Sequence, residues 1–122
     1  MAYGKELIID LHKCNPETFN RESIKRYFKE LCALIKMKRS KLTWWDDHNV
    51  LIEDQQTEPH LKGTSAVQFI LTSSIVIHTL DLMGAVYINV FSCKDFDSQV
   101  VMEFTKNWFK GEIVSHHEIE RL

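Results

Sequence analysis

Residues 65–79 contain the pattern that decides the expected fold, and they read Ser-Ala-Val-Gln-Phe-Ile-Leu-Thr-Ser-Ser-Ile-Val-Ile-His-Thr. Two apolar runs rich in β-branched residues lie on either side of a Thr-Ser-Ser step, which is typical of two strands joined by a short connection. We therefore expect strands at about 65–72 and 74–80. The core of a strand does not need a serine pair, a histidine at 78 or a cysteine at 93. This stretch and Cys93 therefore also supply the candidate catalytic residues.

The rest of the chain is expected to add further strands and two helices. The first helix begins near Asn20, a good N-cap residue, and its apolar positions recur at helical spacing: Ile24, Tyr27, Phe28, Leu31, Leu34 and Ile35. The second helix begins at Asp97 and ends at Gly111. The remaining strands are expected at about 7–12, 40–45, 85–92 and 112–119, and residues 46–63 as a long acidic loop with a short strand at about 50–52.

The order of these elements favours one fold class. A β-α-β unit, then a run of strands, then α-β indicates an α+β two-layer sandwich, in which two helices pack on one face of a mainly antiparallel sheet. The second face must be polar or covered. A second copy of a chain this small could cover it, so a homodimer is a hypothesis at this point. Residues 1–122 are expected to form a single domain.

Composition limits the classes of function. The chain has 122 residues, 44% of them hydrophobic, and 15 basic against 17 acidic side chains give a net charge of −2. That balance gives no electrostatic case for binding nucleic acid or an anionic membrane. No apolar run approaches the roughly 20 residues of a membrane span, and the first residues lack the features of a signal peptide. A cytoplasmic protein is expected.

Cysteine and histidine spacing does not predict structural bonds or metal. The three cysteines are Cys14, Cys32 and Cys93, an odd number with no Cys-x-x-Cys pair, so neither a disulfide framework nor a zinc site is expected. Cys32 falls in the helical apolar pattern and is expected in the core. The histidines have no helical i, i+4 pair, and no metal is expected.

Ser73, Ser74, His78 and Cys93 are nucleophile, base and acid types on neighbouring strands. Ser73 and His78 are five residues apart, so on one continuous strand they point to opposite faces. They can meet only if the chain turns or bulges at the Thr72–Ser73 step, or if Ser73 lies outside the strand. A Ser-His pair without a Gly-x-Ser-x-Gly elbow is a weak hydrolase signal. A hydrogen-bonded core histidine and a small buried cysteine are the alternatives for His78 and Cys93.

The same residues resemble a family. Ser65 lies eight residues before Ser73, His78 five after it and Cys93 twenty after it, and the pattern is similar to the small prokaryotic S-adenosylmethionine decarboxylases. Typical members read Glu-Ser-His-x-x-Ile-His-Thr-Trp-Pro-Glu here, followed by an aromatic-rich strand that ends Phe-Thr-Cys. The ending in this chain is Phe-Ser-Cys at 91–93. The similarity covers most of the chain, including a closing Val-x-His-x-Glu-like segment.

The resemblance implies self-processing. Ser73 would attack the carbonyl of Thr72 and form an ester, with Ser65 steadying the intermediate. His78 would help remove the Ser73 α-proton, so that elimination cuts the chain between 72 and 73. Residue 73 would become a pyruvoyl group, which forms a Schiff base with the substrate amine and acts as the electron sink for decarboxylation. Cys93 would return the proton as general acid. The implied pathway is spermidine and polyamine biosynthesis.

This chain also departs from the family pattern. Thr72 and Ser74 replace the family's Glu and His, while Leu80 and Leu82 replace a Trp and a Glu that help to hold the adenosine part of the substrate. The 46–63 loop is about a dozen residues longer than in typical members. A basic amino acid such as arginine or ornithine is therefore an alternative substrate, since loop carboxylates could meet a guanidinium or an amine. Those carboxylates are Asp46, Asp47, Glu53 and Asp54.

Two further hypotheses come from other classes. The first is a relative that keeps the fold without processing and acts as a partner or regulator of an active copy. The second is a small thiol hydrolase that uses Cys93 with His78. Chain cleavage before Ser73 would distinguish both from the pyruvoyl enzyme.

Overall fold

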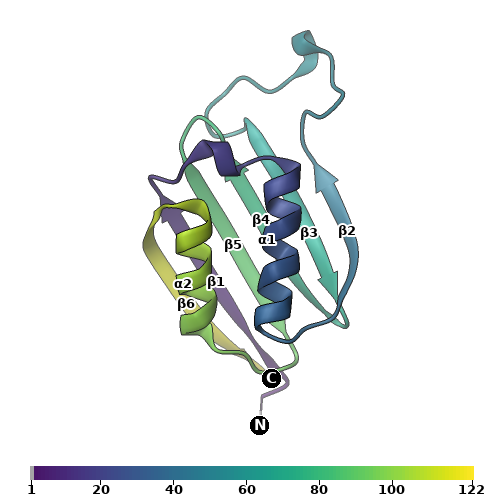
Figure 1. Cartoon of the computed structure of the whole chain (residues 1–122), viewed down its shortest axis with the longest axis vertical. Helices are drawn as coiled ribbons and strands as arrows, with labels where there is room; N and C mark the ends of the chain where they lie inside the picture. Colours follow the sequence, from purple (N-terminus) through teal and green to yellow (C-terminus); the bar gives the residue numbers. More distant parts are fainter. Residues whose placement is uncertain (1) are drawn as a thin grey trace.

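A computed structural model of the chain describes residues 2–122. It contains a six-stranded sheet in the order β2-β3-β4-β5-β1-β6, and all five neighbouring pairs are antiparallel. The strands are β1 (Gly4–His12), β2 (Arg39–Trp45), β3 (Gly63–Ile70), β4 (Ser73–Leu80), β5 (Ala85–Ser92) and β6 (Glu112–Arg121). Helices α1 (Arg21–Leu34) and α2 (Ser98–Phe109) lie side by side on one face of the sheet (Figure 1). The expected α+β two-layer sandwich is confirmed.

Both helices begin at the predicted caps. The Asn20 side chain accepts a hydrogen bond from the Ser23 N–H at 2.8 Å, and the Asp97 carboxylate accepts from the first turn of α2. Such caps satisfy backbone donors that have no partner within the helix. Helix α2 ends at Phe109, and its C-cap residue Lys110 adopts a left-handed conformation with φ 55° just before Gly111.

The core lies between the sheet and the two helices. Tyr27 on α1 is fully buried against α2, and its hydroxyl lies 2.6 Å from Thr105 Oγ1. The sheet contributes Leu7, Ile9, Leu11, Ala66, Ile75, Ile77, Val86, Ile88 and Val90. Leu34, predicted on the same stripe as Tyr27, is 47% exposed. Leu34 is the last residue of α1, and it does not share the burial of the rest of the stripe.

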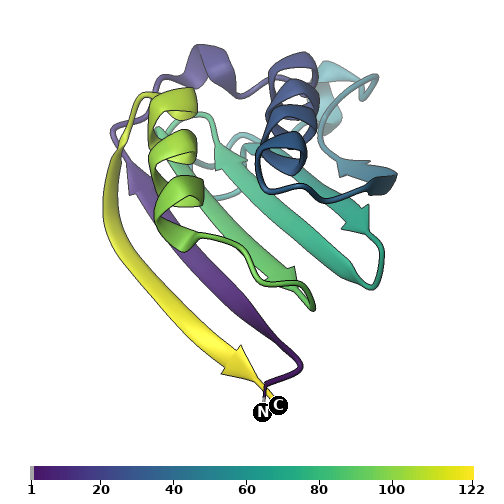
Figure 2. The same ribbon diagram turned by 60° about the horizontal axis from the view of Figure 1, so that its bottom comes forward.

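The other face of the sheet carries no helix, as Figure 2 shows from below. Side chains alternate along each strand, so this open face presents Ile8, Val67, Phe69, Val76, His78, Tyr87, Asn89 and Phe91. Most are half-buried by their neighbours in the sheet, and Phe69 is 44% exposed. This face mixes apolar side chains with polar ones, among them Asp10 and Asn89, and its apolar part is typical of a surface that meets another one.

The segment between β2 and β3 projects from the end of the sheet opposite the two termini (Figure 1). The short strand predicted at 50–52 is wrong: this region contains a 3-10 turn, η2 (Ile52–Asp54). Local bonds replace strand pairing, since the Val50 N–H donates to Asp47 O and the Asp54 N–H to Leu51 O. A second 3-10 turn, η1 (Pro16–Thr18), precedes α1. Among the described residues, no helix is both long and apolar enough to cross a membrane.

Candidate active site

The β3–β4 hairpin places Ser73 at the end of the sheet where the chain termini lie (Figure 1). Leu71 and Thr72 form the two-residue connection, and Ser73 pairs with Ile70 across it. Ser73 is the first residue of β4, its side chain is buried, and it starts the series that faces the helices. Because β4 pairs with β5, the chain just beyond β5 brings Cys93 beside this turn.

Three side chains are in contact there. The Cys93 backbone N–H donates to Ser73 Oγ at 3.1 Å, and the Ser73 hydroxyl lies 3.6 Å from Cys93 Sγ. Thr72 Oγ1 lies 3.3 Å from the same sulfur and donates to the Leu71 carbonyl at 2.7 Å. The structure therefore brings together three of the residues that the sequence singled out: Thr72, Ser73 and Cys93.

The Cys93 thiol differs from the other two. Side-chain hydrogen bonds with Thr72, then with Ser73 and Tyr3, lower the pKa of Cys93, and desolvation opposes them only in part. Burial instead raises the pKa of Cys14 and of Cys32 to about 11. Cys32 lies in the core as predicted. Since the thiolate is the reactive form, Cys93 is the cysteine whose environment favours chemistry.

Ser65 and His78 form a second pair, on the open face. They are directly opposite each other on β3 and β4, and Ser65 Oγ lies 2.7 Å from His78 Nδ1. The imidazole is exposed, so the alternative of a core histidine is wrong. Ser65 and His78 line a pocket of about 370 Å³ together with Trp45, His60 and Leu61.

Within one chain Ser73 and His78 do not meet. Strand β4 runs in register with β3 from Ser73 to Leu80 without a bulge, so the two side chains point to opposite faces. Five residues of extended chain also separate them by roughly 16 Å along the strand. Neither condition set by the sequence, a turn or bulge at the Thr72–Ser73 step or a Ser73 outside the strand, is fulfilled inside the monomer.

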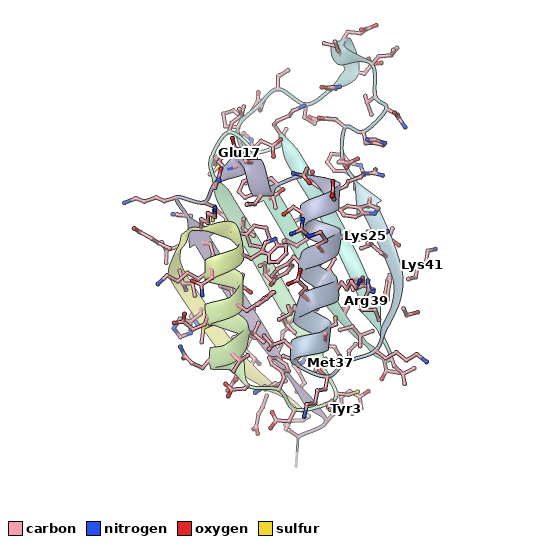
Figure 3. All side chains as sticks on the ribbon, viewed as in Figure 1. Tyr3, Glu17, Lys25, Met37, Arg39 and Lys41 are labelled. Atoms are coloured by element: carbon pink, nitrogen blue, oxygen red, sulfur yellow. The ribbon has the colours of Figure 1, made fainter. Side chains whose placement is uncertain are left out.

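A pocket of about 430 Å³ opens beside Cys93, and sequence reasoning did not find it. Tyr3 and Lys5 from the start of the chain and Glu118 and Glu120 from its end contribute to the lining. Figure 3 shows Tyr3 at this end of the molecule. The remaining lining residues are Ala2, Gly4 and Asp95. The sequence signals for it were Cys93 itself and the closing segment that contains Glu118.

The side chains that line this pocket carry more negative than positive charge. Lys5 Nζ lies 3.1 Å from Asp95 and 3.2 Å from Glu118, and it also donates to the Phe96 carbonyl. Hydrogen bonds from Ser98 and Lys5 lower the pKa of Glu118. With Glu120 as a third carboxylate against one ammonium group, the lining suits a cationic ligand.

Two carboxylates of the acidic loop form ion pairs with basic side chains of the same chain. Arg21 donates to both oxygens of Asp46, at 2.7 and 2.8 Å, and this pairing lowers the pKa of the carboxyl. Lys62 Nζ lies 2.9 Å from Asp47. Glu53 and Asp54 are exposed on the projecting turn. These carboxylates lie at the opposite end of the sheet from Cys93 (Figure 1). Among residues 2–122, no group of side chains suits a metal ion.

The fold places the chain in a known structural class. It is similar to the solved adenosylmethionine decarboxylase from Aquifex aeolicus VF5, with a TM-score of 0.75 and 18% sequence identity over 98% of this chain and 91% of that chain. That likeness concerns the fold. The sequence itself matches the model of the S-adenosylmethionine decarboxylase family over residues 5–122. The chain belongs to the S-adenosylmethionine decarboxylase family.

Proposed function

We propose that this chain is a pyruvoyl-dependent decarboxylase of S-adenosylmethionine in polyamine biosynthesis, made by self-cleavage between Thr72 and Ser73. Residues 1–122 act as one domain that is cut into 1–72 and 73–122. The observation that carries the proposal is the contact of the Ser73 hydroxyl with the backbone and thiol of Cys93 in a tight turn. Family membership supports it.

The residues at the turn fit the processing chemistry. Ser73 Oγ bonds to the Thr72 carbonyl carbon, the amide C–N bond breaks, and the hydroxyl proton passes to the nitrogen. Loss of the Ser73 α-proton then breaks the Cβ–O bond, which releases Thr72 as a carboxylate. The dehydroalanine formed in this way becomes an imine when a proton moves from its nitrogen to Cβ; water then adds to the imine carbon, ammonia leaves, and the carbonyl of the pyruvoyl group remains. The Cys93 N–H holds the attacking oxygen, which limits its motion before the bond forms.

A second copy of the chain completes the site in this proposal. The processing base and its partner, His78 and Ser65, lie on the open face and are hydrogen-bonded to each other, away from Ser73 of the same chain. The half-buried apolar side chains of the open face suit packing against the same face of a two-fold partner. Ser65 and His78 of the partner subunit then approach the turn at Thr72–Ser73. A homodimer is thus required for processing.

In the mature enzyme the pyruvoyl group at residue 73 supplies the electron sink for loss of carbon dioxide. Cys93, in contact with Ser73 before cleavage, returns a proton to the substrate carbon. The adjacent pocket, lined by Asp95, Glu118 and Glu120, suits the positive charge of a sulfonium substrate. A cytoplasmic location completes the proposal, because the three cysteines are free thiols, as is usual in a reducing compartment.

A basic amino acid is the second candidate substrate. The acidic pocket beside Cys93 would also accept the cationic end of arginine or ornithine. The loop carboxylates give it less support, since Asp46 and Asp47 are paired with Arg21 and Lys62. This alternative also follows from the absence of the family's Trp and Glu, whose positions are taken by Leu80 and Leu82. A direct assay can test it.

Intact-mass measurement under denaturing conditions tests the proposal. The wild-type chain is expected to give two fragments cut before residue 73, and Ser73→Ala a single intact chain. Carbon dioxide release from S-adenosylmethionine, arginine and ornithine then assigns the substrate. A wild-type chain that stays whole after long incubation overturns the proposal of a self-processing enzyme. That result favours the hypothesis of a non-processing relative that regulates an active copy.

A further inference from the structure

Thr72, whose carbonyl is attacked in the proposed processing, has an unusual backbone conformation. Among residues 2–122, five non-glycine residues have positive φ: Lys13, Lys36, Asn49, Thr72 and Lys110. Thr72, with φ 53°, is the one with a branched Cβ. It is the second residue of a two-residue hairpin connection, a position that takes glycine or asparagine when φ is positive. A β-branched residue in this conformation is a genuine outlier.

The surroundings hold Thr72 in this conformation. The antiparallel pairs Phe69–Ser74 and Ile70–Ser73 fix both ends of the connection. The Thr72 hydroxyl bonds to the Leu71 carbonyl and contacts Cys93 Sγ, while the Cys93 N–H anchors the next side chain, Ser73. Strained conformations persist only where neighbouring structure determines them in this way, and they concentrate at functional sites.

Building on the proposed self-cleavage, we propose that Thr72 is a positioning residue whose strained left-handed backbone accelerates cleavage of the bond that follows it. In a left-handed residue the Cβ is crowded against the carbonyl oxygen that follows, and here that oxygen belongs to the scissile carbonyl. Attack by Ser73 Oγ makes the carbonyl carbon tetrahedral, and rupture of the C–N bond then frees Thr72 from the hairpin. Both changes release the crowding, so the strain raises the ground state more than the transition state.

The first experiment measures cleavage rates by denaturing mass spectrometry on freshly purified full-length chains. Thr72→Gly and Thr72→Asn both accept positive φ and are expected to cleave about tenfold more slowly than wild type, as expected from the strain of one such residue. Thr72→Val keeps the branched Cβ and loses the hydroxyl, so it is expected to cleave faster than Thr72→Gly. The matched control, Lys110→Gly, relieves a positive φ at the end of α2 and is expected to cleave at the wild-type rate.

A second measurement reports the strain without any cleavage. In the Ser73→Ala background, where the chain stays whole, Thr72→Asn is expected to raise the thermal unfolding midpoint by about 4 °C. Wild-type rates in both Thr72→Gly and Thr72→Asn overturn the inference, as does a Thr72→Val variant as slow as Thr72→Gly. An unchanged midpoint in the Ser73→Ala background also overturns it. If the wild-type chain itself never cleaves, the proposed function fails and this inference fails with it, whereas a failure confined to the Thr72 variants leaves the proposed function intact.

Discussion

Ser65 Oγ lies 2.7 Å from His78 Nδ1 on the open face of the sheet, whereas Ser73 begins the series that faces the helices. Ser73 and His78, the candidate nucleophile and base, are five residues apart in the sequence but lie on opposite faces of the sheet. The division explains why a monomer of this fold is an incomplete processing unit in the proposed function.

Complementation between two inactive chains tests this division. Ser73→Ala and His78→Ala are each expected to stay uncleaved when produced alone. When the two are coexpressed, the His78→Ala chain keeps its Ser73 and receives His78 of the partner subunit, so this chain is expected to be cut. Intact masses distinguish the two chains. Absence of any cleavage in the mixture, with mixed dimers shown to be present, would contradict a site completed by the partner.

Substitution on the open face is expected to disrupt the proposed dimer. Val76 is half-buried at the centre of that face, so Val76→Asp would place an unpaired carboxylate in the interface, which is costly to desolvate. Light scattering is expected to show monomers, and cleavage is expected to stop. Lys25→Asp, on the exposed side of α1, is the matched control and is expected to remain dimeric. A monomeric wild-type chain would remove the basis for this prediction.

Thiol alkylation is expected to follow the pKa differences among the three cysteines. In Ser73→Ala the bonds of Thr72 and Tyr3 remain, so the pKa of Cys93 is expected to stay below its ordinary value of 9.0. A lower pKa means a larger thiolate fraction at neutral pH, hence faster reaction. Cys14 and Cys32, with pKa values of about 11, are expected to react only at higher pH or after unfolding. Peptide mapping after iodoacetamide treatment gives the three profiles, and equal rates would contradict the assignment.

Cys93→Ala is expected to separate the two stages of the proposed reaction. Processing needs the Ser73 hydroxyl and the Cys93 backbone N–H, which the substitution keeps, so cleavage is expected to continue. Turnover loses its proton donor, and general acids typically contribute about 10²–10⁴-fold. Carbon dioxide release per cleaved chain is the measurement. Full turnover in the variant would exclude the thiol as the donor.

The buried bond between Tyr27 and Thr105 gives a prediction on stability. Tyr27→Phe leaves the Thr105 hydroxyl without a partner in the core and is expected to cost about 1–3 kcal/mol of unfolding free energy. Adding Thr105→Val removes the unpaired group, so the double variant is expected to recover part of that loss. Urea denaturation of the four chains measures the coupling, and strict additivity would show that the contact contributes nothing.

Local patterns in the sequence were sufficient for the elements of this fold. Alternating apolar residues, the Asn20 and Asp97 caps and the Thr-Ser-Ser step depend on neighbours within a few positions, and the structure confirms the helices and the six strands. The error at 50–52 has the same origin: three apolar residues resemble a strand, but a strand forms only where a neighbour can pair with it.

The period-two alternation of a strand also determined, from sequence alone, that Ser73 and His78 point to opposite faces. Only the tertiary structure decided what surrounds them. The insertion of β1 between β5 and β6 brings Tyr3, Lys5 and Glu118 to the thiol of Cys93, across nearly the whole length of the chain. No local pattern encodes such a meeting, because it arises from the order in which strands pair and not from the residues next to each one.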